Sequence, residues 1–132
     1  MVVDIRVNVA GATMHAALAA GQVPPSVPAQ ALIDTGTDVT AVAPALLRRL
    51  GARVVNTTTT QGISGSVQVR LFLVTLFVLD AGRPHLPWLT APDLLVLELP
   101  GPLAFDVLIG LDILRTCRLF LDGPGQQFTL DF

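Results

Sequence analysis

The sequence predicts an all-β protein, and three patterns support this prediction. Residues 2–9 alternate apolar and polar side chains from the second position onward, which is the period of a half-buried strand in an antiparallel sheet. Residues 53–79 read as a β-hairpin whose tip is Gly62-Ile63-Ser64-Gly65. Residues 117–121 and 127–132 flank a glycine-rich turn and form a second, terminal hairpin.

Length and composition limit how the chain can be organised. Its 132 residues suffice for one hydrophobic core, so we expect a single domain over residues 1–132. Apolar residues make up 52% of the chain and charged residues only 14%, which leaves few polar groups to cover the surface. We therefore expect a partner subunit to cover part of it. The eight basic residues are scattered arginines, so nucleic acid is not an expected partner.

The first half of the chain contains three further segments with a local pattern. Ala12 to Ala20 is alanine-rich and precedes Gly21, which favours a short helix, although a strand fits nearly as well. Residues 22–30 contain three prolines and are expected to form a loop. Strands are expected over Ala31 to Asp34 and over Val39 to Val42.

The second half is interpreted in the same way. Ala45 to Leu50 lies between Pro44 and Gly51, which is typical of a helix of one to two turns. Residues 80–92 contain three prolines and are expected to be irregular. We expect strands over residues 94–99 and 104–109, and a short helix from residue 111 to about residue 116.

Several classes of site and location are not expected. The longest nearly apolar run, Leu71 to Leu79, is about half the length of a membrane-spanning helix and reads as a buried strand. The first residues lack the pattern of a secretory signal, so we expect a cytoplasmic protein without membrane insertion. Cys117, His15 and His85 do not form a ligand set for zinc, and neither a metal nor another cofactor is expected. Cys117 lies in an apolar segment and reads as a buried structural thiol.

The segment that points most directly to chemistry is an apolar strand leading into Asp34-Thr35-Gly36. A carboxylate at the end of a buried strand is held rigidly at the edge of an apolar layer, which is how a catalytic acid is usually mounted. The tripeptide alone occurs by chance in about one chain in twenty of this length, so its context decides. The structural alternative for Asp34 is a turn-forming aspartate with a local backbone bond.

Part of this pattern occurs a second time. Residues 35–40 align with residues 109–114 with a shared glycine and a shared aspartate, and each segment follows an apolar strand. In this alignment Leu108 stands where Asp34 stands. The chain thus looks like two copies of one plan of strand, turn and helix, with a catalytic-type carboxylate only in the first copy.

Three segments together resemble the retropepsins, the retroviral-type aspartic proteases, and their bacterial and cellular relatives. They are residues 31–40, the hairpin tip at residues 62–65, and residues 107–114, and they follow one another with the order and spacing of that family. The resemblance covers about residues 30–132. It implies a closed, mostly antiparallel acid-protease β-barrel with a flap hairpin and two short helices. It also implies a homodimer in which each subunit contributes one aspartate and one flap.

The resemblance implies a role for each matching residue. Asp34 is the expected catalytic carboxylate; Thr35 would bond across the two-fold axis, and Gly36 would let the backbone pass close to the partner and substrate. Asp112 reads as a structural N-cap of its short helix. At the remaining positions both substrate binding and a purely structural role stay open: Asp38, Ile63, Ser64, Leu108 and Ile109.

The chain departs from the viral pattern in three places. Leu111 replaces the viral arginine that follows the later glycine, so the ion pair made by that arginine cannot form. An insertion over about residues 12–30 has no viral counterpart. The terminal hairpin is longer, which puts the viral dimer of interleaved terminal strands in question for this chain.

Peptide hydrolysis without a metal needs a base to activate water and an acid to protonate the substrate. Two carboxylates about 3 Å apart supply both functions by sharing one proton. Because the chain offers one suitable aspartate, Asp34 of two subunits must meet on a two-fold axis. The leading hypothesis is therefore a homodimeric aspartic endopeptidase that acts on peptide or protein substrates.

Two rival hypotheses remain. The first is a catalytically inactive module of the same fold that binds peptides or serves only for dimerisation. The second is an unrelated β-barrel in which the Asp-Thr-Gly tripeptide occurs by chance, and it predicts that Asp34 lies away from any two-fold interface.

Overall fold

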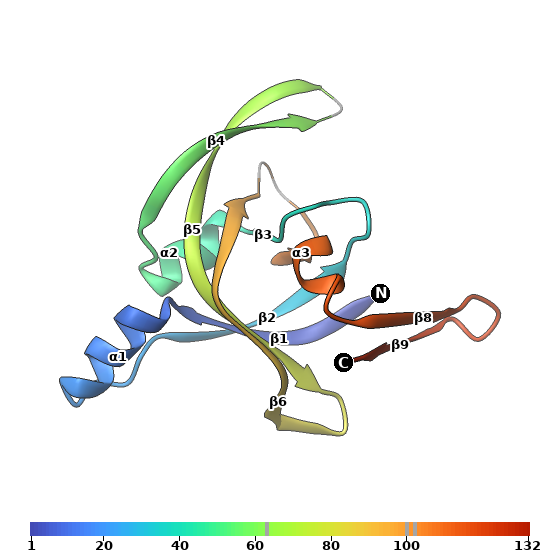
Figure 1. Cartoon of the computed structure of the whole chain (residues 1–132), viewed down its shortest axis with the longest axis horizontal. Coiled ribbons are helices and arrows are strands. Elements are labelled where there is room, and N and C mark those ends of the chain that lie inside the picture. Colours follow the sequence, from blue (N-terminus) through green and yellow to red (C-terminus); the bar gives the residue numbers. More distant parts are fainter. Residues whose placement is uncertain (63, 100, 102) are drawn as a thin grey trace.

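The structure is a computed structural model that describes residues 1–132 except residues 63, 100 and 102 and the side chain of residue 84. It is an all-β fold, as predicted, with short helices between the strands (Figure 1). In chain order the elements are β1 (Val2–Val9), α1 (Gly11–Ala19), β2 (Ser26–Ile33), β3 (Ala41–Val42), α2 (Pro44–Leu50), β4 (Val54–Gly62), β5 (Gly65–Asp80), β6 (Arg83–Glu98), β7 (Val107–Ile109), α3 (Leu111–Leu114), β8 (Arg118–Asp122) and β9 (Gln127–Asp131).

Six strands close into a barrel, and a seventh extends from it. The sheet order is β1-β2-β7-β3-β6-β5-β4, and β1 also pairs with β5, from Ile5 opposite Val78 to Val9 opposite Val74. This additional pairing closes the ring and leaves β4 outside it, as the free arm of the β4–β5 hairpin (Figure 1). Closure removes the sheet edges that would otherwise be open to pairing with other chains.

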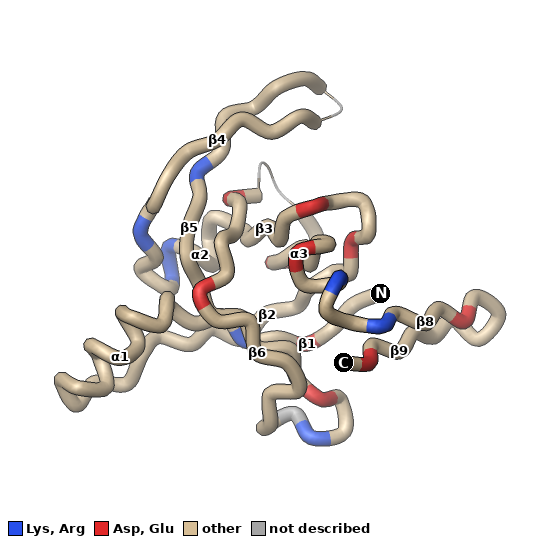
Figure 2. Tube along the Cα trace, in the orientation of Figure 1, with Lys and Arg blue, Asp and Glu red and all other residues tan. Residues whose placement is uncertain are grey.

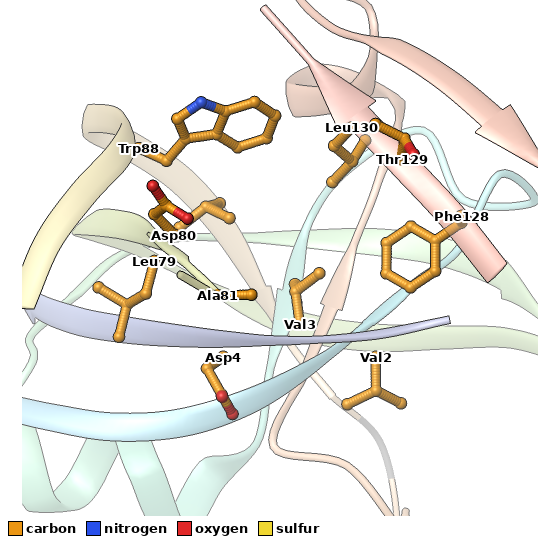
Figure 3. Close-up of a pocket in the computed structure, with 11 residues that line it drawn as sticks. Val2, Val3, Asp4, Leu79, Asp80, Ala81, Trp88, Phe128, Thr129 and Leu130 are labelled. Atoms are coloured by element: carbon orange, nitrogen blue, oxygen red, sulfur yellow. The ribbon is translucent and has the colours of Figure 1, made fainter. Parts of the chain in front are cut away.

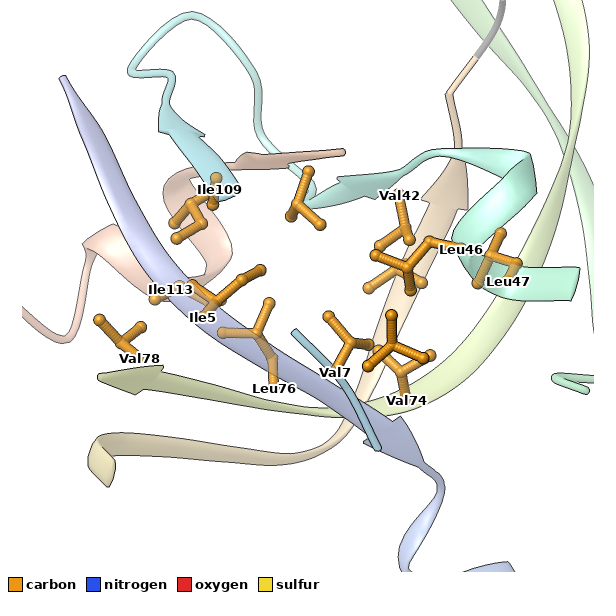
Figure 4. Close-up of a cluster of buried hydrophobic side chains, with 14 of the residues drawn as sticks. Ile5, Val7, Val42, Leu46, Leu47, Val74, Leu76, Val78, Ile109 and Ile113 are labelled. Atoms are coloured by element: carbon orange, nitrogen blue, oxygen red, sulfur yellow. The ribbon is translucent and has the colours of Figure 1, made fainter. Parts of the chain in front are cut away.

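The hydrophobic core fills the inside of this barrel. Alternation along β1 and β5 turns every second residue inward, which buries Ile5 and Val7 of β1 and Val74, Leu76 and Val78 of β5. The core continues to Leu46 and Leu47 of α2 at one end and to Ile109 and Ile113 at the other (Figure 4).

The helices begin within one residue of the predicted starts, but α3 ends at Leu114 rather than at about residue 116. Pro44 occupies the first turn of α2, and Gly51 ends it in the left-handed conformation with φ of 64°. Residues 12–20 are helical rather than extended, since α1 covers Gly11 to Ala19, and α1 buries no side chain. With α3 included, the described residues contain three helices, one at each of the three places that the local sequence favours and one more than the two that the family resemblance implies.

The predicted loop over residues 22–30 is wrong in its second half, because β2 begins at Ser26 and contains Pro28. The Ile33 N–H donates toward β1, to the Met1 carbonyl, whereas the Gln30 N–H donates to the Asp106 carboxylate on the other side of β2. Pro28 presents its nitrogen on the same side as Gln30, away from β1. The missing N–H therefore removes no hydrogen bond to β1, which explains why a proline is tolerated there.

The prediction of an irregular segment over residues 80–92 is also wrong, because β6 runs from Arg83 to Glu98 and absorbs the predicted strand at 94–99. Along most of its length β6 pairs only with β5, and β3 joins its other edge at Leu97 and Glu98. Prolines are compatible with such a free edge. Pro92 and Asp93 form a bulge opposite Thr75, and Asp93 accepts the backbone N–H of Gly11 at 2.7 Å.

Two predicted strands are shorter in the structure than in the prediction. The strand expected over residues 39–42 is reduced to Ala41 and Val42, and that expected over residues 104–109 is reduced to Val107–Ile109. Thr40 and Asp106, which directly precede these strands, still bond to neighbouring strands: the Leu97 N–H donates to the Thr40 carbonyl, and the Asp106 N–H donates to the Gln30 carbonyl.

The two predicted hairpins are confirmed. In the β4–β5 hairpin Gly62 lies opposite Gly65, and all residues of β4 are exposed except Thr60, which is half-buried. β4 is therefore an arm that is exposed on both faces. The terminal hairpin of β8 and β9 forms its own two-stranded sheet, and Phe132 packs edge-to-face on Trp88 with 4.3 Å between the ring centroids.

No helix in the described part of the chain is long and apolar enough to cross a membrane. The longest nearly apolar run, Leu71 to Leu79, lies within β5, as predicted.

The arginines remain dispersed over the fold and form no single basic patch among the described residues (Figure 2).

One ion pair ties the root of the β4–β5 hairpin to β6 and leads to a prediction about pH. Arg70 binds Glu98 through two hydrogen bonds, one of them 2.7 Å from Nε to Oε2. These bonds hold the pKa of Glu98 below its ordinary value. The folded-state pKa is thus lower than the unfolded-state value of about 4.3. The pair therefore stabilises the fold fully above that value, and its contribution disappears as the pH falls through the folded-state pKa.

We expect Glu98→Gln to lower the Tm relative to the parent protein at about pH 7, and the difference to shrink toward about pH 3. Thermal unfolding of both proteins across this range measures the effect. Glu98 is the only glutamate in the chain, so the matched control is Asp131→Asn on the exposed terminal hairpin, for which we expect no pH-dependent difference of this kind. A Tm difference for Glu98→Gln that stays constant with pH would contradict the argument.

Candidate active site

Asp34 lies at the first position after β2, where two neighbouring strands hold the backbone. The Ile33 N–H donates to the Met1 carbonyl at 2.9 Å, and the Asp34 N–H donates to the Ile109 carbonyl at 3.0 Å. The Asp34 side chain is half-buried, and its Oδ1 accepts the Gly36 N–H at 2.9 Å. The carboxylate is therefore oriented by its own turn while one face stays open to solvent.

Gly36 and Thr35 complete this turn. A Cβ atom on Gly36 would lie 3.1 Å from Asp34 Oδ1, so a side chain there would press on the carboxylate. Thr35 is exposed, and its hydroxyl is free to reach a group outside this chain. The Asp34–Gly36 bond is the local backbone bond that the structural alternative for Asp34 expected, and the catalytic role of residues 34–36 remains a prediction.

The loop that carries Asp34 passes over the end of β7. β2 pairs with one edge of β7 and β3 with the other, so residues 34–40 must bridge from one side to the other. The Leu111 N–H donates to the Thr37 carbonyl at 2.9 Å, and the Asp112 N–H donates to the Asp38 carbonyl at 3.0 Å. These two backbone hydrogen bonds attach the loop to the start of α3.

Gly110 is the point of closest approach between the loop and β7. A Cβ atom built on Gly110 would lie 2.8 Å from the Val39 carbonyl carbon and 3.0 Å from both the Thr37 oxygen and the Thr40 nitrogen. These are backbone atoms and cannot rotate away. The glycine is therefore required by packing against the loop.

A buried hydrogen-bond network joins the loop to α3 through Thr40 and Asp112. Asp112 Oδ2 accepts the Thr40 N–H at 2.8 Å, and Asp112 Oδ1 accepts the Thr40 hydroxyl at 2.7 Å and the Ile113 N–H at 2.9 Å. The Thr40 hydroxyl also accepts the Gly110 N–H at 3.1 Å, and Thr40 is fully buried. Asp112 is therefore structural, as predicted.

The predicted N-cap role of Asp112 is nevertheless wrong. Gly110 occupies the N-cap of α3, and Asp112 lies inside the helix with its side chain turned toward Thr40. The reason is that Thr40 offers two donors, a backbone N–H and a hydroxyl, which a local cap would leave unpaired in the interior.

The two copies of the strand-and-turn plan lie side by side in the sheet. β2 and β7 pair in parallel, with Ile33 opposite Ile109. Asp34 therefore lies beside Gly110, rather than beside Leu108 as in the sequence alignment. The copies share a plan of elements but are offset by two residues in register.

Asp38 has a cationic neighbour that the sequence did not predict. Its side chain is 82% exposed, and its Oδ1 lies 3.6 Å from Nη2 of Arg115 at the end of α3. Position 111 lacks the viral arginine. Arg115, four residues further along the chain, places its guanidinium beside the loop instead. The prediction that Leu111 cannot form the ion pair of the viral arginine is unchanged, and the pair between Arg115 and Asp38 is an additional contact that was not predicted.

The remaining predicted site residues lie in different settings. Ile63 is outside the described residues, whereas Ser64 is exposed at the tip of the β4–β5 hairpin. Ile109 is buried in the core, and Leu108 is half-buried on the opposite face of β7. The structure brings Asp34, Thr35, Gly36 and Asp38 together in one loop and places Ser64 and Leu108 on separate elements.

Three cavities among the described residues lie away from the 34–38 loop and include none of its residues. The cavity in Figure 3, about 500 Å³, lies between the start of β1, the end of β5 and the terminal hairpin. A second cavity of about 500 Å³ adjoins α2. Thr35, Gly36 and Asp38 of the Asp34 loop are exposed, whereas Asp34 is half-buried.

Metal-ligating and thiol groups are not gathered at this loop. Among the described residues no group of three or more His, Cys, Asp or Glu side chains is placed to hold a metal ion. Cys117 is partly buried and donates to the Ile113 carbonyl at 3.4 Å. Burial raises the pKa of the Cys117 thiol, which disfavours the reactive thiolate.

Three residues that shape the site were not predicted from the sequence: Thr40, Gly110 as a packing glycine, and Arg115. The internal repeat had marked Gly110 and Asp112, but nothing local connects Asp112 with Thr40, which is 72 positions away. The sequence feature that could have indicated this contact is the position of Thr40, a threonine directly before an apolar strand.

The fold and the loop define a class of protein: a closed β-barrel that presents one Asp-Thr-Gly turn, supported by a Gly-Leu-Asp segment. The family model for aspartyl proteases matches residues 5–113. The chain therefore belongs to the aspartyl protease family, which confirms the membership predicted from its three motif segments.

One solved structure supports the fold in particular. The retroviral protease-like domain of Ddi1 from Leishmania major is similar to this chain with a TM-score of 0.50 and 17% identity, over 99% of this chain and 89% of that chain. The fold is thus retropepsin-like, as predicted. No curated protein sequence matches the chain.

The Thr40 network predicts a selective loss of stability. Thr40→Val keeps the shape of the side chain but leaves the buried Gly110 N–H without its acceptor and removes one donor from Asp112. We expect a loss of about 1–3 kcal/mol in the free energy of unfolding, measured by chemical denaturation. Thr57→Val on the exposed arm β4 is the control and should stay within about 0.5 kcal/mol of the parent. Equal effects of the two substitutions would show that the network is not stabilising.

The close packing of Gly110 predicts a second effect. Gly110→Ala should destabilise the protein by about 1–3 kcal/mol or more, because the methyl group overlaps backbone atoms of the loop. Gly123→Ala is the matched control, since a Cβ there meets nothing within 4 Å. Thermal unfolding of both variants tests this, and a neutral Gly110→Ala would refute the close approach of the loop.

Proposed function

We propose that the protein is a homodimeric aspartic endopeptidase in which Asp34 of each subunit supplies one of two catalytic carboxylates. The observation that carries the proposal is the oriented Asp34 carboxylate in an open Asp-Thr-Gly turn on a retropepsin-like barrel. Family membership supports peptide hydrolysis as the reaction.

Among the described residues, the carboxylates of Asp112 and Asp38 are engaged in other contacts, so we do not assign either as the second catalytic group. Asp112, its counterpart in the internal repeat, is occupied by hydrogen bonds from Thr40 and Ile113 and turned into the interior. Asp38 is directed to Arg115. A second copy of Asp34 is therefore the proposed partner, and catalysis requires dimerisation.

Two Asp34 carboxylates about 3 Å apart would share one proton, because both cannot ionise at that distance. The ionised group takes a proton from a water molecule, whose oxygen attacks the carbonyl carbon of the peptide bond. The protonated group gives its proton to the carbonyl oxygen. When the tetrahedral intermediate breaks down, the C–N bond is cleaved and the leaving nitrogen is protonated.

The substrate is proposed to be an extended peptide between the Asp34 loop and the β4–β5 hairpin acting as a flap. The exposed arm β4 and the tip with Ile63 and Ser64 would offer backbone groups and exclude water on closing. Asp38, held beside Arg115, would receive backbone N–H groups of the peptide, and Leu108 would line an apolar subsite. Ile109 supports the site from the core.

The proposed dimer surface surrounds the Asp34 loop. The start of β1 is bonded to β2 next to Asp34, and the terminal hairpin lies on the same side of the barrel (Figure 1). This surface exposes large apolar side chains, including Phe120 at 58% and Leu121 at 67%. Phe132 packs on Trp88 of its own subunit, which favours contact through the hairpin rather than exchange of the last strand.

The test is to purify Asp34→Asn beside the parent protein and assay both on a peptide library from about pH 3 to pH 7. We expect kcat/KM to fall by at least about 10³-fold, since a positioned acid–base group contributes 10²–10⁴-fold. Asp106→Asn, an exposed aspartate outside the loop, is the control and should retain activity. Sedimentation must show that the variant still forms the dimer.

A mixed dimer sharpens the test. When two differently tagged copies are co-purified and only one carries Asp34→Asn, the dimer should be as inactive as the double variant. Equal cleavage by parent and Asp34→Asn would exclude the proposal. Peptide binding by the parent without cleavage would instead support an inactive binding module.

A further inference from the structure

The α1 arm, defined as α1 and the loop after it (residues 11–25), connects β1 to β2 and projects from the barrel (Figure 1). None of the nine residues of α1 is buried. The arm contains no Asp, Glu, Lys or Arg, so it has no such charged side chain with which to bind the barrel. A helix of this length is not stable in water by itself. The order of the arm therefore depends on how its start is fastened to the barrel.

A side chain of β6 fastens this start. Ala10, at the N-cap of α1, makes no side-chain hydrogen bond, and the first turn contains no acidic residue. Instead, the Asp93 carboxylate accepts the Gly11 N–H at 2.7 Å. Asp93 lies in the bulge of β6 with φ of 47°, in the left-handed region that few residues other than glycine adopt. Bulges of this kind redirect a side chain. Asp93 thus supplies, from a distant strand, the N-cap that the arm itself lacks.

The hydrogen bond from Gly11 to Asp93 crosses over β5, which pairs with β1 on one side and with β6 on the other. Asn8, three residues before Gly11, is opposite Thr75 of β5, and the bulge with Asp93 is opposite the same Thr75. The bond is exposed and therefore lies on the outside of the barrel. The residues on both sides of Thr75 belong to the core, so the Thr75 side chain points outward, toward this crossing.

Thr75 is covered where the arm is fastened. It is only 3% exposed, whereas Leu73 and Phe77 on the same face of β5 are half-buried. Thr75 Oγ1 and the neighbouring Asn8 Oδ1 are buried and have no hydrogen-bond partner among the described residues. Burial of polar atoms without a partner costs free energy that contact with water would recover. The closed position of the arm therefore carries a cost that an open position would not.

The contact between the α1 arm and β5 combines two opposing effects. The Asp93 bond holds the arm down, and the unpartnered atoms of Thr75 and Asn8 favour its release. We propose that the α1 arm is a strap that opens and closes over β5 while the barrel stays folded. In the closed state Asp93 caps α1; in the open state water reaches Thr75 and Asn8. Weakly held segments open locally in this way without global unfolding. The strap uses none of residues 34–38 and does not depend on the proposed function.

Hydrogen exchange of backbone amides, followed by NMR on the ¹⁵N-labelled full chain, measures the equilibrium constant for opening of the strap. In the parent protein we expect the amides of α1 to be protected, but at least about tenfold less than those of β1 and β5, which exchange when the barrel unfolds. Asp93→Gly keeps the left-handed backbone but removes the cap. It should raise the opening constant of α1 at least about threefold.

Thr75→Val should have the opposite effect. Valine has the shape of threonine but needs no hydrogen bond, so the opening constant of α1 should fall at least about threefold. Asp80→Gly is the matched control for Asp93→Gly, because Asp80 also accepts a glycine N–H, that of Gly82 at 2.8 Å, in the β5–β6 hairpin. It should leave the exchange of α1 unchanged. The comparison of α1 with β1 and β5 in the parent needs no variant and decides the question even if a variant fails to fold.

Four outcomes would overturn the proposal. Exchange of α1 at the rate of β1 and β5 in the parent would show that the arm opens only with the barrel. Absence of any protection in α1 would show that the closed state does not form. An opening constant unchanged by Asp93→Gly would remove the role of the cap. Unchanged exchange of α1 in Thr75→Val, together with slower exchange in β5, would show that Thr75 stays covered when α1 opens.

Discussion

The hydrogen bonds between Asp112 and Thr40 are the interaction on which the site geometry depends. The Asp34 loop must cross the end of β7 because its flanking strands lie on opposite edges of that strand. Such a crossing leaves loop N–H groups over the barrel interior, where an unpaired donor is costly. The Asp112 carboxylate accepts one of these N–H groups, that of Thr40, together with the Thr40 hydroxyl, and so ties the loop to α3, while Gly110 leaves room for the loop to lie close.

This constraint explains why one half of the internal repeat carries the candidate chemistry and the other half supports it. The first turn presents Asp34 outward with its carboxylate oriented by Gly36. The second turn uses its glycine for packing and its aspartate for holding Thr40. A single subunit thus builds a rigid support for one carboxylate, which fits the proposal that the second carboxylate comes from another copy.

The rest of the chain extends the barrel outward in three directions. The β4–β5 hairpin projects with both faces exposed, the terminal hairpin carries exposed Phe120 and Leu121, and α1 stands away from the core. The insertion that contains α1 is not independent of the barrel, because Asp93 in the bulge of β6 binds the Gly11 N–H. The same bulge lies opposite Thr75, which pairs with Asn8 of β1.

Local patterns in the sequence determined the elements whose residues interact with near neighbours. Alternation located β1, Pro44 and Gly51 set the ends of α2, and the glycines at residues 62 and 65 located the hairpin tip. The Asp-Thr-Gly segment and the later Gly-Leu-Asp segment indicated the family through residue identity and spacing alone. These features depend on backbone preferences and short-range contacts, which a sequence displays directly.

Only the tertiary structure decided the features that depend on distant partners. Prolines in β2 and β6 suggested loops, yet they lie on strand edges whose unpaired side tolerates them. Asp112 turned to Thr40 rather than to its own helix end, and Arg115 took a place beside Asp38. In each case a residue far along the chain decides which hydrogen bonds are lost or gained, and local sequence does not show which segments become neighbours.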